Sequence, residues 1–133
     1  MKTTVLDASA LLAMLFGEPG VEEMRILFHK AAAADKPLLI TAVNWAEVLN
    51  RVTRKQGGNG LTTVRQLAAN GPLHIVPVDA ELADTAAAYK AADQLGLADA
   101  FAAALAKSRK AELVTADREF KSVESEIKII WLK

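Results

Sequence analysis

Four acidic residues stand at points of the sequence where carboxylates can do chemistry: Asp7, Glu47, Asp99 and Asp117. Asp7 and Asp117 each follow a short apolar run that is typical of a buried strand, and open parallel sheets hold their active sites beyond the carboxyl ends of the strands. The chain has no cysteine and two histidines, so the available ligands are mainly oxygen atoms. Such ligands favour a hard divalent cation such as Mg²⁺. The pattern therefore predicts an acidic metal site.

Each acid also has a structural explanation. Asp7 and Asp117 are each placed to cap the helical segment that follows them. Glu47 lies four residues before Arg51 on a predicted amphipathic helix, where the two side chains can pair. Asp99 is harder to explain in this way, because its helix is apolar on every side and an unpartnered buried carboxylate costs roughly several kcal/mol. A functional role is therefore favoured most clearly for Asp99.

Short strands alternate with helices along the chain. We expect strands at 5–6, 38–40, 73–78, 113–114 and 127–132, and helices at 8–16, 21–34, 42–55, 62–69, 80–95, 98–107 and 117–123. The glycine-rich stretch 57–60 is predicted to end the 42–55 helix. This alternation predicts an α/β fold, a three-layer α/β/α sandwich with a central, mainly parallel sheet.

Composition narrows the class of protein further. With 133 residues, 52% of them hydrophobic and 24% charged, the chain fits one globular domain over residues 1–133. No apolar run reaches the roughly 18 residues that span a bilayer, so we expect a cytoplasmic protein without a membrane partner. Sixteen basic and sixteen acidic side chains cancel, which argues against strong non-specific nucleic-acid binding and is compatible with a nuclease whose acids bind metal.

Four segments taken in order carry a family resemblance. They are Asp-Ala-Ser at 7–9, an acid inside the third helix at Glu47, Leu-Gly-Leu-Ala-Asp-Ala at 95–100, and Leu-Val-Thr-Ala-Asp-Arg-Glu-Phe at 113–120. Over the whole chain, this order resembles the PIN-domain ribonucleases, in particular the VapC-like toxins of bacterial type II toxin–antitoxin pairs. The resemblance implies a PIN-like fold and endonucleolytic cleavage of RNA that depends on Mg²⁺ or Mn²⁺.

The resemblance also implies a set of site residues. Asp7, Glu47, Asp99 and Asp117 would surround one or two ions, with the hydroxyls of Ser9 and Thr115 beside them. We expect Asp7 and Asp99 to be direct ligands, Asp117 a ligand or an outer-shell group, and Glu47 a residue that holds a water or a second metal. Mg²⁺ retains several waters, one of which can be activated for in-line attack on a phosphodiester.

Partners follow from the same resemblance. It implies an RNA substrate such as tRNA or rRNA, a homodimer, and a cognate antitoxin with a segment that covers the acidic pocket. Four basic residues could supply a local surface for RNA contacts: Arg51, Arg54 and Lys55, which follow Glu47, and Arg118, which follows Asp117.

Three alternatives remain open. A haloacid-dehalogenase-like phosphotransferase also has an Asp after its first strand, but it needs a second Asp two residues later, where this chain has Ser9. A receiver-like signalling module has paired acids near the first strand, where this chain has Asp7 alone. A PIN-like fold that serves protein interaction without cleavage is the third alternative.

Overall fold

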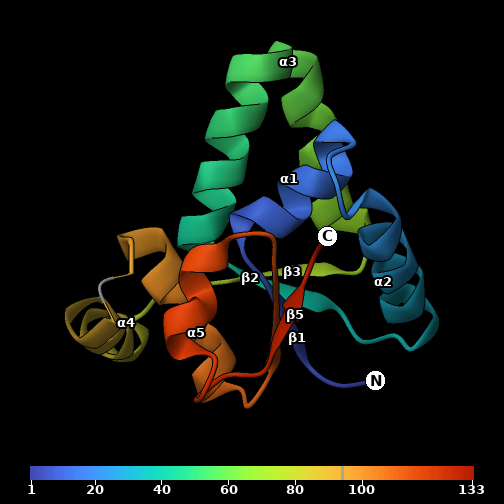
Figure 1. Ribbon diagram of the computed structural model, residues 1–133. Coiled ribbons are helices and arrows are strands. Elements are labelled where there is room, and N and C mark those ends of the chain that lie inside the picture. The colour runs from blue at the N-terminus through green and yellow to red at the C-terminus, as the bar shows by residue number, and fades with distance from the viewer. Residues whose placement is uncertain (94) are drawn as a thin grey trace.

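A five-stranded parallel sheet forms the centre of the computed structural model, which describes residues 1–93 and 95–133 (Figure 1). The strands are β1 (Thr4–Leu6), β2 (Leu38–Thr41), β3 (Leu73–Val76), β4 (Glu112–Thr115) and β5 (Ile129–Trp131). Their order is β3-β2-β1-β4-β5, and each neighbouring pair is parallel. The predicted fold class is confirmed.

Helices cover both faces of this sheet. On one face lie α1 (Ala8–Phe16), α2 (Val21–Ala33) and α3 (Ala42–Asn70); on the other lie α4 (Ala80–Asp93), α5 (Leu97–Ser108) and the short 3₁₀ helix η1 (Arg118–Val123). Neighbouring residues of a strand point to opposite faces, so Val5 packs in the core beneath α4 and α5 while Leu6 packs in the core beneath α1, α2 and α3. Two separate cores thus hold the three layers together.

The element α3 contains two of the predicted helices. Its first arm breaks at Gly57, where φ is 69° and ψ is −156°, as the glycine-rich stretch predicts, and its second arm runs to Asn70 and includes the predicted helix at 62–69. Figure 1 shows the two arms of α3 rising above the rest of the molecule. Val52 on the first arm and Val64 on the second are both buried in the same core, so the bend lets the two arms pack against each other.

Several other element ends differ from the prediction by one or two residues, among them both ends of β5 and the last residues of β3 and α4. β3 stops at Val76, because Pro77 has no N–H to continue the ladder of hydrogen bonds. Helix α4 ends at Asp93, and the residue that follows it in the predicted helix, Gln94, lies outside the described residues. Over the described part of the chain, none of the helices has the length and apolar character needed to cross a bilayer.

The order of the strands creates a crevice at one place. From β1 the chain proceeds to β2 and β3 on one side and returns to β4 and β5 on the other, so the topological switch point lies between β1 and β4. Leu6 pairs with Val114, which brings Asp7 beside Thr115 at the carboxyl edge of the sheet. Ligands of open α/β sheets bind at this kind of crevice.

The bend in α3 gives a test of the fold. Gly57→Ala is expected to lower the free energy of unfolding by about 1–3 kcal/mol, because its φ and ψ lie in a region that only glycine enters readily. Gly58→Ala is the matched control, since a side chain there meets open space and Gly58 has no positive φ. Urea unfolding of both variants measures the difference. Equal free energies of unfolding for the two variants would contradict the backbone conformation assigned to Gly57.

Candidate metal centre

Asp7 forms the buried floor of the site. Only 2% of its surface is exposed, and it follows β1 directly, where its carboxylate caps α1 by accepting a hydrogen bond from the N–H of Ala10 at 3.0 Å. Ser9 Oγ lies 2.8 Å and 2.9 Å from the two carboxylate oxygens, and Thr115 Oγ1 donates to Oδ2 at 2.6 Å. Neutral donors therefore fix this carboxylate on three sides.

The same hydroxyls tie the ends of β1 and β4 together. Ser9 Oγ accepts a hydrogen bond from the N–H of Ala116 at 3.0 Å, and Thr115 Oγ1 accepts one from the N–H of Asp117 at 2.9 Å. Both hydroxyls therefore connect the carboxylate of Asp7 to the backbone that follows β4. Asp117 is thereby held close to Asp7, although the two residues are far apart in the sequence.

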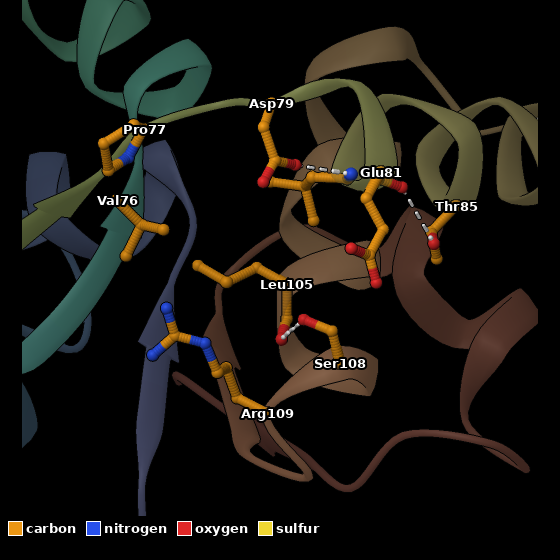
Figure 2. Close-up of a pocket in the computed structure, with 9 residues that line it drawn as sticks. Val76, Pro77, Asp79, Glu81, Thr85, Leu105, Ser108 and Arg109 are labelled. Carbon is orange, nitrogen blue, oxygen red and sulfur yellow. Dashed lines mark hydrogen bonds between the residues drawn. The ribbon is translucent and has the colours of Figure 1, made fainter.

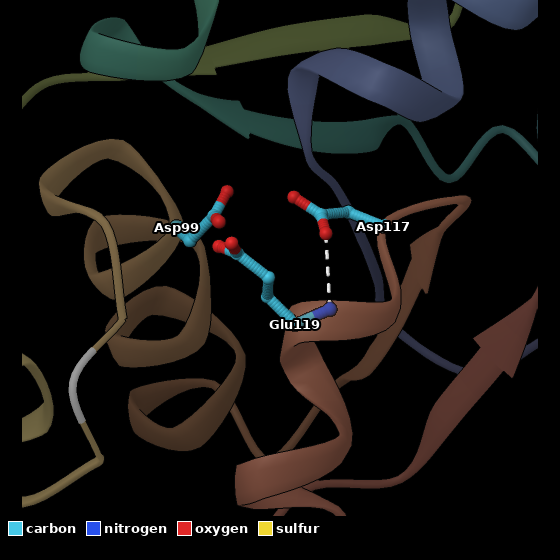
Figure 3. Close-up of side chains that lie close together, drawn as sticks. All are labelled: Asp99, Asp117 and Glu119. Carbon is cyan, nitrogen blue, oxygen red and sulfur yellow. Dashed lines mark hydrogen bonds between the residues drawn. The ribbon is translucent and has the colours of Figure 1, made fainter.

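Three carboxylates converge above this floor: those of Asp99, Asp117 and Glu119. One oxygen from each lies within 4.8 Å of the others, and Figure 3 shows the three side chains facing a common point. Asp117 also caps η1, where its Oδ1 accepts a hydrogen bond from the N–H of Glu119 at 3.0 Å. This geometry brings together two of the predicted acids and adds Glu119.

Glu119 is the site residue that the sequence reasoning missed. The sequence predicts a helical segment at 117–123, in which Glu119 has no assigned role. In the structure the buried Phe120 anchors the 3₁₀ helix in the core, which leaves Glu119 exposed on the side of Asp99. An acid two residues after a strand-end Asp, next to a buried aromatic residue, is the sequence signal that points to it.

Glu47 lies apart from this group. It is exposed on α3 and is not among the acids that the described part of the chain brings within 4.8 Å of one another. Asn44, three residues earlier and therefore on the same side of the helix, donates a hydrogen bond to the carbonyl of Ala98 at 3.1 Å. Since Ala98 precedes Asp99, Glu47 is placed on the side of α3 that borders the crevice.

The two most buried acids of the site have raised pKa values. Burial raises the pKa of Asp7 to about 6, although hydrogen bonds from Thr115, Ala10 and Ser9 act in the opposite direction. Burial, together with the negative charges of Asp117 and Asp7, raises the pKa of Asp99 to about 8. Desolvation and like-charge repulsion both disfavour an ionised carboxyl group. The site therefore holds more negative charge than its surroundings stabilise.

No basic side chain relieves this charge within the residues that the structure describes, because the one ion pair among them joins Arg25 to Glu22 in α2. The alternative pair between Glu47 and Arg51 is accordingly not formed. A divalent cation is the remaining kind of group that relieves the repulsion without protonating the acids. The donor set fits Mg²⁺ or Mn²⁺, since both prefer carboxylate oxygens and water.

The basic candidates for RNA contacts differ in their surroundings. Lys55 Nζ lies 4.4 Å from the centre of the Phe16 ring. The Arg118 guanidinium lies 4.7 Å from that of Trp131 and donates to the carbonyl of Leu132 at 3.4 Å. Arg51 and Arg54 are exposed on the first arm of α3, so they are the two with the greater freedom to reach a ligand.

A hollow of about 250 Å³ lies elsewhere, between α4 and the end of α5 (Figure 2). Three of its polar side chains bond within the chain: Asp79 accepts a hydrogen bond from the N–H of Leu82 at 2.8 Å, Thr85 donates to the carbonyl of Glu81, and Ser108 donates to that of Leu105. Asp79 thereby caps the start of α4. The converging carboxylates, and not this hollow, form the candidate centre.

The pKa of Asp99 predicts how metal-free protein responds to pH. A carboxyl group with a folded-state pKa of about 8, above the ordinary 3.8, destabilises the folded chain increasingly as pH rises from about 4 to about 8. Asp99→Asn removes this effect, so in EDTA the variant should melt at a higher temperature than wild type at pH 8.5, with a smaller difference at pH 5. Each kcal/mol corresponds to roughly 4 °C in a chain of this size.

Thermal melts with EDTA at several pH values measure this difference, and Asp84→Asn, on the exposed side of α4, is the control. Added Mg²⁺ should raise the melting temperature of wild type more than that of Asp99→Asn. If the difference in melting temperature between wild type and Asp99→Asn stays constant from pH 5 to pH 8.5, the charge of Asp99 does not destabilise the folded protein.

Solved structures with the same fold are similar to this chain over most of its length. A structure of VapBC2 from Rickettsia felis bound to a promoter DNA fragment matches with a TM-score of 0.80 and 15% identity, covering 98% of this chain and 99% of that one. A toxin–antitoxin complex from Klebsiella pneumoniae matches with a TM-score of 0.72 and 19% identity, covering 96% of each chain. At these identities the likeness concerns the fold.

A third structure is VapC20 of Mycobacterium tuberculosis, described as a toxin that cleaves the sarcin–ricin loop. It matches with a TM-score of 0.67 and 16% identity, covering 91% of this chain and 95% of that one. No curated protein sequence matches the chain. The family model of the PIN domain, however, matches residues 4–126, a span that includes the strand-end acids, the hydroxyls beside them and Glu119. The chain belongs to the PIN domain family.

Proposed function

We propose that this protein is an endoribonuclease that uses Mg²⁺ or Mn²⁺ to cleave RNA phosphodiester bonds, and that it is the toxin of a toxin–antitoxin pair acting in the cytoplasm. The observation that carries the proposal is the convergence of Asp99, Asp117 and Glu119 within 4.8 Å, near the buried Asp7, whose charge acts on Asp99. Membership of the PIN domain family and the fold shared with a toxin that cleaves the sarcin–ricin loop support it.

In the proposed site, some residues would bind the metal ion and others would hold the binding residues in position. Asp99, Asp117 and Glu119 would hold the ion, and Asp7 would contribute from the floor of the site while Ser9 and Thr115 keep its carboxylate in place. A bound Mg²⁺ or Mn²⁺ supplies a Lewis acid for the scissile phosphate and lowers the pKa of a water molecule. Glu47, on the side of α3 that faces α5, would orient the attacking water.

Removal of single charges tests the proposed reaction. Asp7→Asn, Asp99→Asn and Glu119→Gln should each lower the rate of RNA cleavage by about 100-fold or more, because carboxylates that bind or neighbour the ion are lost. Purified protein would be assayed on total tRNA and a structured RNA, with Mg²⁺, Mn²⁺ or EDTA. Isothermal titration with Mn²⁺ would record metal affinity in the same samples.

The control is Asp84→Asn, which should cleave RNA at the rate of wild type. Metal-dependent cutting by wild type that is lost in EDTA and in the three variants is the expected result. Full activity of Asp99→Asn or of Glu119→Gln would contradict the assigned site. An absence of cleavage by folded wild type with either metal, across these RNAs, would favour the interaction module without cleavage.

Two arginines on α3 are placed to guide RNA toward the acids. Arg51 and Arg54 follow Glu47 by four and seven residues, which is roughly 6 and 10 Å along the helix axis. Both are exposed, and neither belongs to the ion pair found in the described part of the chain. The first arm of α3 thus carries positive charge beyond the acidic site, where it can bind the negatively charged backbone of RNA.

The double variant Arg51→Ala/Arg54→Ala should raise KM for RNA and change kcat little, because phosphate contacts outside the reacting centre bind substrate and transition state alike. If each arginine neutralises one phosphate of a single strand, the slope of log affinity against log salt should fall in magnitude by about 1.4. Cleavage and binding at several salt concentrations measure both quantities.

Arg65→Ala on the second arm of α3 is the matched control, since this arginine is also exposed but lies on the returning helix. It should leave KM and the salt slope unchanged. A double variant with the KM and salt slope of wild type would contradict the proposed contact between α3 and RNA.

The antitoxin is part of the same proposal. Two of the structures with this fold are a VapBC assembly and a toxin–antitoxin complex, which supports a protein partner for this chain. We propose that a cognate antitoxin covers the acidic pocket and that the toxin forms a homodimer. The phosphotransferase alternative gains no such support, because a hydroxyl of Ser9 contacts Asp7 where that chemistry needs a second acid.

A further inference from the structure

A buried amide links α3 to the helix that carries Asp99. Asn44 has an exposed fraction of 0%, and it lies in the first turn of α3, where its backbone N–H donates to Thr41 Oγ1 at 3.0 Å. Its side-chain oxygen accepts a hydrogen bond from the same hydroxyl at 2.5 Å, and its side-chain nitrogen donates to the carbonyl of Ala98 at 3.1 Å. The amide therefore has a partner at both ends.

The second of these bonds reaches the first turn of α5, whose N-cap residue makes no side-chain capping bond. Gly96 occupies that position, whereas α1, α3 and η1 are each capped by their own Asp or Thr. Ala98 is the second residue of α5 and directly precedes Asp99. Because Asn44 donates to a carbonyl, it does not cap the free N–H groups of α5, but it ties the first turn of that helix to α3.

The bond between Asn44 and Ala98 connects the helix that carries Asp99 to the central sheet. Thr41 ends β2, which pairs with β1 in the sheet, so the chain of bonds from Thr41 through Asn44 to Ala98 ties the first turn of α5 to the sheet. Asp7 and Asp117 are tied to the same sheet through Thr115. Both halves of the acidic group are therefore positioned against one rigid frame, and Asn44 is the connection on the side of Asp99.

We propose that Asn44 is a positioning residue, which holds the carboxylate of Asp99 at the distance from Asp117 and Glu119 that divalent metal binding needs. The inference rests on the proposed function. An apolar side chain at position 44 would fill the same space but make neither bond, and the first turn of α5 would then be held by packing alone. Outer groups that orient metal-binding side chains typically change metal affinity by roughly 10- to 100-fold when they are removed.

The test compares Asn44→Leu and Asn44→Ser with the same changes at Asn50, an exposed asparagine on the same helix. Mn²⁺ affinity would be measured by isothermal titration on metal-free protein, at a temperature where melts show every sample to be folded. Asn44→Leu is expected to weaken Mn²⁺ binding by about 10- to 100-fold, and both Asn50 variants should bind as wild type does. If Asn44→Leu fails to fold, Asn44→Ser, which keeps a small polar group but cannot reach Ala98, decides the question.

Kinetics add a readout that lost stability alone would not change. At limiting Mn²⁺ the kcat of the Asn44 variant should fall, excess Mn²⁺ should recover most of it, and KM for RNA should stay within about twofold, because the arginines of α3 remain in place. A folded Asn44 variant with the Mn²⁺ affinity of wild type overturns the inference. Wild type that binds Mn²⁺ but cuts no RNA would instead contradict the proposed function. The Mn²⁺ affinities of the variants would still test whether Asn44 positions the acids. Wild type that binds no Mn²⁺ overturns both.

Discussion

Repulsion between carboxylates at the carboxyl edge of β1 and β4 is the constraint on which the arrangement of the site depends. Asp99, Asp117 and Glu119 share one small volume, and burial together with neighbouring charge raises the pKa of Asp99. The residues of this group do not stabilise one another, so they must be held in place by elements that are stable for other reasons. The buried strands and the two cores on either side of the sheet meet that requirement.

The groups that hold the acids are neutral, and this has a chemical consequence. Hydroxyls of Ser9 and Thr115 contact Asp7, and the amide of Asn44 contacts the backbone beside Asp99. An arginine or lysine in any of these positions would also fix a carboxylate, but it would neutralise the charge and compete with a cation. Neutral donors keep the geometry and leave the negative charge available. In the proposed reaction, this arrangement would let the site bind a positive ion and, through that ion, a phosphate.

Much of this arrangement follows from the sequence, for identifiable reasons. Asp7 and Asp117 stand at the ends of apolar strands, and the pairing of parallel strands brings such ends to one edge of the sheet. Glu119 was missed because its position depends on the 3₁₀ geometry of η1, and a helical turn was predicted without that detail. The helix break at Gly57 follows from the glycine-rich stretch, but the sharp bend that brings Val52 and Val64 into one core does not, because glycine both ends helices and permits a sharp bend.

The acids of the site also serve the local folding of the chain. Asp7 caps α1 and Asp117 caps η1 through the same carboxylates that would serve the metal. Asparagine caps helices about as well as aspartate, whereas alanine loses about 1 kcal/mol at such a position. Aspartate-to-asparagine changes therefore remove the charge and keep the cap, while changes to alanine remove both. Asp99 and Glu119 cap no helix, so at these two positions the charge can be removed without loss of a cap, and there the chemistry of the site can be separated most cleanly from its architecture.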